Sequence, residues 1–205
     1  MGMLRRIRDW LVITLKGKRI AVLGPRGVGK THLLSYLSRG ELPSQATQTL
    51  APEKVPARRF EIAEHDVPLK STHDVSGDSS SYREWQRLLK KADITLYLVR
   101  FDLLSADDAD HKKRVRADAG HIRDMVGEST SVVIVGTHCD LDPRFKQLTP
   151  GNIGNYSDTF RRDPVVHEAA LRIGKPERIH YALGSLKTLE SAERLAADIL
   201  KQVFE

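Results

Sequence analysis

Short apolar runs alternate with amphipathic stretches along most of this chain. Runs of strand length, bounded by turn-forming residues, occur at 19–23, 60–64, 67–73, 94–99, 132–135 and 179–183. Apolar residues at helical spacing, or helix-capping signals, occur at 31–39, 81–91, 105–126, a short stretch that ends at 173, and 189–204. This alternation predicts an α/β fold with a mostly parallel sheet.

Two segments lack either periodicity. Residues 41–56 contain Pro43, Pro52 and Pro56, so we expect an irregular loop there, and loops of this length are usually functional or disordered. Residues 141–164 are rich in Pro, Gly, Asn and Asp, which predicts an insertion with one turn of helix.

The composition is that of an ordinary globular domain. The 205 residues are 40% hydrophobic and 29% charged, which suits a single domain. No stretch approaches the ~20 apolar residues of a membrane span, and the apolar run at 10–15 is too short for a signal peptide. Cys139 is the only cysteine, which excludes an internal disulfide and suits a reducing compartment. We therefore predict a soluble cytoplasmic protein.

The positive charge is concentrated at the N-terminus. Of the net charge of +6, the first twenty residues carry +5, which indicates a local contact rather than a nucleic-acid-binding fold. Residues 1–17 form an amphipathic basic segment that could pack on its own domain, dock on a partner or contact an anionic membrane surface. Its apolar positions at helical spacing are Leu4, Ile7, Leu11 and Leu15.

The strongest chemical motif follows the first predicted strand and opens a helix. Residues 24–31 match the phosphate-binding pattern G-x-x-x-x-G-K-[ST] at every fixed position. Glycines let backbone N–H groups wrap around a polyphosphate, and the positive end of the helix dipole faces it. Lys30 supplies a mobile charge for the β/γ oxygens, and the Thr31 hydroxyl suits Mg²⁺. The predicted nucleotide-binding residues here are Gly24, Pro25, Arg26, Gly27, Val28, Gly29, Lys30, Thr31 and His32.

A second motif follows the most apolar predicted strand, 132–135. Asp140 stands at the mouth of this strand, where its carboxylate could accept hydrogen bonds from the N1–H and the exocyclic amine of guanine. Adenine has no such donor pair, so an unpaired buried carboxylate would reject it. The phosphate motif alone leaves ATP and GTP open, and Asp140 favours guanine over the alternative of a P-loop ATPase or kinase.

At Thr137-His138-Cys139-Asp140 the chain resembles the Ras-like small GTPase superfamily, whose base-reading motif is N/T-K-x-D. Histidine replaces lysine, and this T-H-x-D form is similar to that of Roc-type domains. The resemblance covers residues 18–205 and implies a three-layer P-loop G domain. In that fold a mostly parallel central sheet with one antiparallel strand carries helices on both faces. It also implies binding of GTP/GDP and Mg²⁺, with protein effectors or regulators as partners.

The same resemblance assigns the remaining site residues. Ser185 and Leu186 match the family's S-A-K loop, where a backbone N–H reaches the guanine oxygen. Asp74 and Gly77 fit its D-x-x-G motif, so Asp74 would hold Mg²⁺ through a water and the Gly77 N–H would contact the γ-phosphate. Mg²⁺ would be ligated by Thr31, Asp74 and a threonine of the long loop, where Thr47 and Thr49 compete and Thr49 is preferred.

Two departures from the family pattern bear on catalysis. Asp78 stands where the family commonly has a water-orienting glutamine, and a carboxylate beside the γ-phosphate would be repelled. Arg26 could stabilise the transition state in cis, or block the attacking water and an incoming arginine finger. With Lys30 and Gly77 these two residues form the predicted catalytic set. We expect slow, partner-stimulated hydrolysis; the alternative is a nucleotide-binding assembly module with little hydrolysis, which could form a homodimer.

Overall fold

A computed structural model describes most of the chain. The described residues are 18–43, 53–55, 59–62, 65–68, 72–74, 82–147 and 153–204. The predicted basic segment 1–17 lies outside them, as do four predicted site residues of the switch region: Thr47, Thr49, Gly77 and Asp78.

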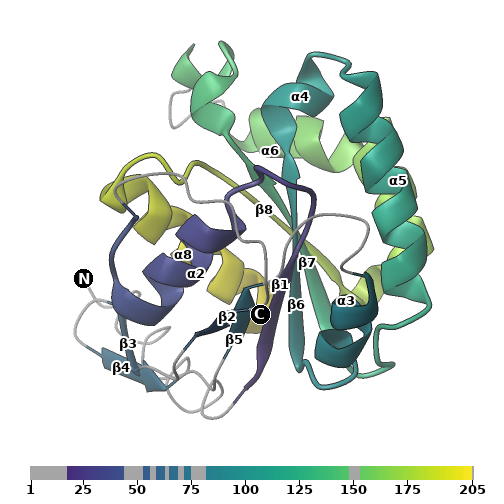
Figure 1. Ribbon diagram of the computed structural model, residues 1–205. Helices are drawn as coiled ribbons and strands as arrows, with labels where there is room; N and C mark the ends of the chain where they lie inside the picture. The colour runs from purple at the N-terminus through teal and green to yellow at the C-terminus, as the bar shows by residue number, and fades with distance from the viewer. Residues whose placement is uncertain are drawn as a thin grey trace.

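A six-stranded sheet with the order β2-β5-β1-β6-β7-β8 forms the centre of the fold (Figure 1). Strands β5 (Thr72–Asp74), β1 (Ile20–Leu23), β6 (Ile94–Arg100), β7 (Ser131–Thr137) and β8 (Ile179–Leu183) pair in parallel with their neighbours. Strand β2 (Glu53–Val55) pairs antiparallel with β5, and β3 (Arg59–Ile62) with β4 (His65–Pro68) forms a separate antiparallel pair.

Helices cover both faces of the sheet (Figure 1). One face carries α2 (Lys30–Arg39) and α8 (Leu189–Phe204), whose apolar residues share one core cluster. The other carries α3 (Tyr82–Leu89), α4 (Phe101–Ser105), α5 (Ala109–Arg123), α6 (Ile153–Arg162) and α7 (Pro164–Ile173). The prediction of an α/β fold with a parallel sheet between helices is therefore confirmed.

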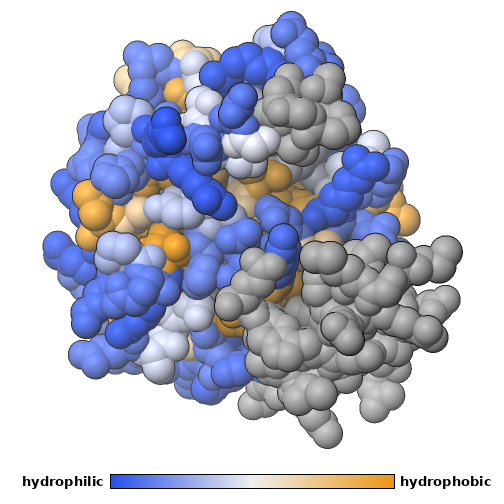
Figure 2. Space-filling model, turned by 180° about the vertical axis from the view of Figure 1, so that it is seen from behind, coloured by the Kyte–Doolittle hydropathy of each residue, from blue (hydrophilic) through white to orange (hydrophobic). Residues whose placement is uncertain are grey.

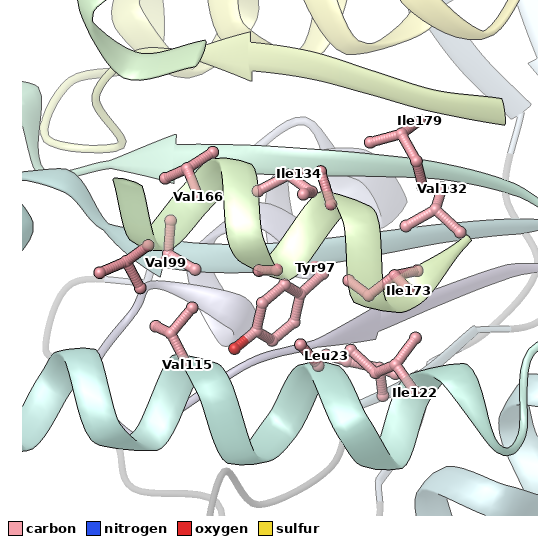
Figure 3. Packing of buried hydrophobic residues seen from close by; sticks show 14 of the residues in the cluster. Leu23, Tyr97, Val99, Val115, Ile122, Val132, Ile134, Val166, Ile173 and Ile179 are labelled. Carbon is pink, nitrogen blue, oxygen red and sulfur yellow. The ribbon is translucent and has the colours of Figure 1, made fainter. Parts of the chain in front are cut away.

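The apolar strands supply both cores because successive side chains of a strand point to opposite faces. In β6, Leu96 and Leu98 belong to the cluster under α2 and α8, whereas Tyr97 and Val99 belong to the opposite cluster. Figure 3 shows Tyr97 in the middle of that second cluster, between the sheet and α5. A strand buried on both faces reads as a continuous apolar run, as the sequence of β6 does.

Helix boundaries follow local capping chemistry. Helix α2 ends at Gly40, whose left-handed backbone (φ 71°) lets its N–H donate to the carbonyl of Tyr36 at 2.8 Å. Helix α7 begins after Asp163, whose carboxylate accepts from the N–H groups of Val165 and Val166, with Pro164 in its first turn. The end of α2 agrees with the sequence prediction, which for the helix at α7 gave only its end at 173.

The structure differs from the sequence prediction in three segments. Strand β2 lies within the predicted loop 41–56, flanked by the prolines that suggested a loop; prolines are tolerated at the ends of an edge strand. The predicted strand 67–73 is divided between β4 and β5. The predicted insertion 141–164 contains the ten-residue helix α6, because Tyr156 and Phe160, four residues apart, are both buried in the core.

The surface is mostly hydrophilic, as Figure 2 shows for the rear face, with small separate apolar patches. Among the described residues the exposed large hydrophobic side chains are Leu141, Leu171 and Leu189. In the part of the chain that the structure describes, no helix is long and apolar enough to span a membrane.

Candidate functional site

The glycine-rich segment predicted to bind phosphate forms a loop between the carboxyl end of β1 and the start of α2. The Lys30 side chain folds back over this loop, and its Nζ donates to the carbonyls of Gly24 at 3.1 Å and Pro25 at 2.8 Å. Lys30 as a whole is only 7% exposed. The charge of Lys30 is therefore held inside the concave side of the loop, while Arg26 at the tip is exposed.

Two glycines of the loop are needed where they stand. Gly29 has a left-handed backbone (φ 89°), and a Cβ there would lie 2.8 Å from Cδ1 of Leu186. Gly24 (φ 142°) faces the backbone carbonyl of Leu98, and a Cβ would overlap it. Because a side chain is excluded at both positions, the backbone can approach a ligand closely. The contact of Gly29 with Leu186 also brings the phosphate loop beside the loop that follows β8.

Thr137, the last residue of β7, joins the second motif to the first. Its Oγ1 lies 3.0 Å from the carbonyl of Val28 in the phosphate loop and 3.1 Å from the carbonyl of Val99 in β6. A hydroxyl has one proton, and these carbonyls accept it. The Nδ1 of His138, 3.0 Å from the same oxygen, is therefore the donor in their contact, which leaves Nε2 as an acceptor.

Asp140 lies in the short 3₁₀ turn η2 (Cys139–Leu141) directly after β7. The buried hydroxyl of Ser185 donates to its Oδ1 at 2.6 Å, and the Lys187 ammonium lies 3.8 Å from its Oδ2. The Asp140 side chain stays 23% exposed, so its carboxylate is held by Ser185 on one side and remains partly accessible to a ligand on the other. The Cys139 N–H donates to the carbonyl of Gly184 at 3.3 Å, which ties the two loops together.

Electrostatics keep the imidazole of His138 neutral. Burial lowers its pKa below the ordinary histidine value, and the positive charge of Arg100 lowers it further. Arg100 ends β6 and pairs with the carboxylate of Asp102, while its backbone N–H donates to Nε2 of His111 at 3.0 Å. Burial lowers the pKa of His111 as well, and its accepting Nε2 agrees with a neutral ring.

The sequence model of the Ras family matches residues 19–205. This chain belongs to the Ras family. The matched range contains the sheet, every helix described above and both loops of the site.

Individual relatives of this Ras-family chain are distant. It is 28% identical over 128 residues to "Ras-like protein family member 10A" of Homo sapiens, and the match covers 60% of the chain and 63% of that relative. It is 25% identical over 197 residues to "GTP-binding protein RHO3" of Saccharomyces cerevisiae, covering 87% of the chain and 78% of the relative. The chain thus spans less than two thirds of the length of the first of these curated relatives.

The residues present fit a guanine nucleotide with Mg²⁺. The phosphate loop has a backbone that no side chain fills, a buried ammonium, and a helix N-terminus behind it. Thr31 is half-buried in the first turn of α2, and Asp74 ends β5, the neighbour of β1, so both belong to the same edge of the sheet. Of the predicted switch residues only the Asp74 backbone is described, so the roles of Thr49, Gly77 and Asp78 stay predictions.

Some features of the site were missed by the sequence prediction. Ser185 was selected for its backbone N–H, and its side chain also orients Asp140. Lys187 and Arg100 were not selected, although both place positive charge around the second motif. A hydroxyl directly after the last strand was visible in the sequence, but its contact with Asp140 joins residues 45 positions apart.

Proposed function

We propose that this Ras-family chain is a switch protein that binds GTP and GDP with Mg²⁺ and reads guanine through Asp140. The observation that carries the proposal is the Asp140 carboxylate, held at 2.6 Å by Ser185 and open in front, at the same sheet edge as the phosphate loop. A carboxylate can accept from both the N1–H and the amine of guanine, whereas ATP offers no such pair. Thr137 supports the proposal because it fixes the distance between the two motifs.

The phosphate loop would hold the β- and γ-phosphates. Nζ of Lys30 now donates to two neutral carbonyls, and charged phosphate oxygens are stronger acceptors, so the ammonium would turn toward them. Thr31, Asp74 and, with GTP, Thr49 would hold Mg²⁺, which neutralises negative charge on the phosphate oxygens. The Gly77 N–H would sense the γ-phosphate. His138, neutral and half-buried, would cover the base in place of the lysine stem.

We further propose that hydrolysis is slow and depends on a protein partner. Asp78 cannot orient an attacking water as an amide does, because its charge is repelled by the γ-phosphate. Arg26 is exposed at the tip of the phosphate loop, where it would either stabilise the transition state or obstruct the water. The same two residues favour the second candidate, a nucleotide-dependent interaction module with little hydrolysis.

We also assign β2 as the antiparallel strand of the G domain.

Nucleotide binding and hydrolysis can be measured separately. Purified chain would be loaded with a fluorescent GDP analogue, and its release timed with Mg²⁺ and with excess EDTA. The proposal expects tight binding and much faster release in EDTA. A release rate that is the same with Mg²⁺ and with EDTA would contradict the role of Mg²⁺. Failure of the chain to bind the GDP analogue would overturn the proposed function.

Single-turnover hydrolysis of GTP then separates the two candidates. Slow but measurable phosphate release supports the switch, and no release over many hours supports the interaction module. Arg26→Ala gives the sign of the arginine's effect: a slower variant shows stabilisation in cis, and a faster one shows obstruction. Lys30→Ala serves as the matched loop variant, since it should weaken binding itself.

A further inference from the structure

A second carboxylate lies two residues after Asp140 and faces the interior. Asp142 is 3% exposed and accepts hydrogen bonds from the backbone N–H of Arg144 at 2.9 Å and from its Nη2 at 2.7 Å. The hydroxyl of Tyr156 in α6 donates to the same carboxylate at 3.1 Å. We call Asp142, Arg144 and Tyr156 the Asp142 clamp. Its members come from a loop and a helix separated in sequence by a segment outside the described residues.

The guanidinium of Arg144 is held in place by further contacts. Its carbon lies 5.8 Å from the ring centres of Phe101 and of Tyr156, and its Nη2 donates to Oγ of Ser105 at 2.6 Å. A planar guanidinium can stack on rings while it donates to a carboxylate at its edge, which a lysine ammonium cannot do. The clamp therefore fastens the loop to both α4 and α6, although half of the Arg144 side chain is exposed.

The clamp reaches Asp140 through a few backbone atoms. The N–H of Asp142 donates to the carbonyl of Cys139 at 3.0 Å and closes the turn that carries Asp140. On the other side, Cys139 is fully buried and its N–H is bonded to Gly184. The backbone is thus fixed immediately before and after Asp140, while the Asp140 carboxylate itself is held by Ser185.

The carboxylates of Asp140 and Asp142 have different surroundings. The hydrogen bonds from Arg144 lower the pKa of Asp142 to about 2, so it is ionised at neutral pH. Its oxygens are occupied by Arg144 and Tyr156, and it is closed to solvent. Asp140, in contrast, keeps an exposed front. The structure therefore contains one carboxylate that a ligand can reach and one that only supports the loop.

We propose that the Asp142 clamp is a positioning device for base specificity, which holds Asp140 where both of its oxygens can accept from guanine. The inference rests on the proposed function and adds residues to it. Without the clamp, Asp140 would keep its contact with Ser185, but its turn would be anchored on one side only. Two simultaneous hydrogen bonds need a defined orientation, so the second of them would be lost first.

Inosine diphosphate provides the probe for that second bond. It keeps the N1–H and the diphosphate of GDP but lacks the exocyclic amine. The ratio of GDP affinity to IDP affinity therefore reports the amine contact with Asp140 and cancels the phosphate contacts. Partial loosening of the whole domain would weaken both nucleotides and leave the ratio unchanged.

We expect Arg144→Ala and Asp142→Asn to lower the GDP:IDP affinity ratio by about 10-fold, taking as a guide the loss that follows when a metal ligand is deprived of its supporting hydrogen-bond partner. Tyr156→Phe keeps the ring that stacks on Arg144 and removes one hydroxyl, so a fall of about threefold is expected without risk to folding. Arg116→Ala breaks an ion pair between α5 and α7 and is the matched control, with the wild-type ratio.

The outcomes are distinguishable. A lowered ratio in the clamp variants, with Arg116→Ala unchanged, supports the inference. A wild-type ratio in Tyr156→Phe and Arg144→Ala, or an equal loss for both nucleotides, overturns the clamp and leaves the proposed function standing. Wild-type protein that binds GDP and IDP equally, or neither, overturns the proposed function and the clamp's role with it.

Discussion

The two faces of the central sheet bury different kinds of side chain. The face under α2 and α8 is aliphatic, and Tyr36 is the only aromatic residue in its buried cluster as far as the described residues show. Among the described residues, the buried cluster of the opposite face contains five Phe, Tyr and Trp side chains, and the carboxylates of Asp118 and Asp142 are buried beside it. The five rings belong to Trp85, Tyr97, Phe101, Tyr156 and Phe160.

The two faces differ in how strictly they fix the positions of the elements packed on them. Aliphatic packing is non-directional and tolerates rearrangement, whereas a buried carboxylate needs its donors in defined places. Asp118 joins Tyr82 at the start of α3, Tyr97 of β6 and Arg114 of α5. Figure 3 shows the Tyr97 ring inside the core with its oxygen toward α5. We infer that both faces supply stability, and that the polar face also fixes where helices and loops begin.

The largest loss of stability is expected from Asp118→Ala. The carboxylate is fully buried, and its removal takes a shared acceptor away from two hydroxyls and the Arg114 guanidinium. Breaking a buried charged network on one side typically costs about 3–5 kcal/mol. Urea unfolding followed by circular dichroism would measure the change.

Tyr82→Phe is the milder partner of that variant. It removes the 2.7 Å hydrogen bond from Tyr82 to Asp118 and keeps the ring, which stacks on His121. We expect a loss of about 1 kcal/mol. If Asp118→Ala costs less than about 1 kcal/mol, the network contributes nothing to stability and the two faces differ in composition alone.

On the aliphatic face, Leu34→Ala is expected to cost about 3 kcal/mol. Leu34 is 1% exposed in the cluster under α2 and α8, and its truncation removes buried area and leaves a cavity. The same unfolding experiment applies, and Leu34→Met should cost far less because it conserves volume. Equally small losses for both variants would mean that this face is loosely packed.

A smaller effect is expected from pH. His111 on the polar face accepts from Arg100 N–H as a neutral ring, and burial lowers its pKa below the ordinary value of about 6.5. As pH falls below that value the unfolded chain binds the proton first, so the free energy of unfolding decreases until the folded pKa is passed. His111→Gln should therefore show a shallower loss of stability between pH 7 and pH 5. An identical slope would contradict the buried neutral histidine.

The smallest effect is expected on the outer surface of the aliphatic face. Arg194 and Glu190 form an exposed i,i+4 pair on α8. Such pairs contribute about 0.3–0.5 kcal/mol, so Arg194→Ala should hardly move the unfolding midpoint. A loss above ~1 kcal/mol would show that surface charge, and not only the buried clusters, distinguishes the faces.

Local patterns predicted the regular elements of this fold well. The strand 179–183 and the helix 189–204 have the predicted bounds, because apolar spacing and flanking turn residues specify them within a few positions. Strand β2 was missed because three residues between prolines carry no periodicity, and its partner β5 lies far along the chain. Helix α6 was missed because Gly154, Asn155 and Ser157 have weak helix propensity, which burial of Tyr156 and Phe160 outweighs.

The candidate site was predictable where one short motif carries the chemistry. The glycine pattern around Lys30 and the position of Asp140 after an apolar strand needed no knowledge of tertiary contacts. The supporting residues did, since Ser185 meets Asp140 and Tyr156 meets Asp142 only after folding. The hydrogen-bond networks of Asp118 and Asp142 on the polar face could not be predicted from residue spacing, because a buried aspartate and a solvated one look alike in sequence.

Nucleotide selectivity of Asp140→Asn tests the central claim most directly. Unlabelled GTP, ATP and XTP would compete with a fluorescent GDP analogue on wild type, on Asp140→Asn and on Asp124→Asn, an exposed control. We predict that GTP far outcompetes ATP on wild type and on the control. In Asp140→Asn, GTP should lose about 100-fold or more, and XTP, whose base offers an acceptor to the new amide, should gain. Equal competition by ATP, or an Asp140→Asn variant that still prefers GTP, would contradict the account.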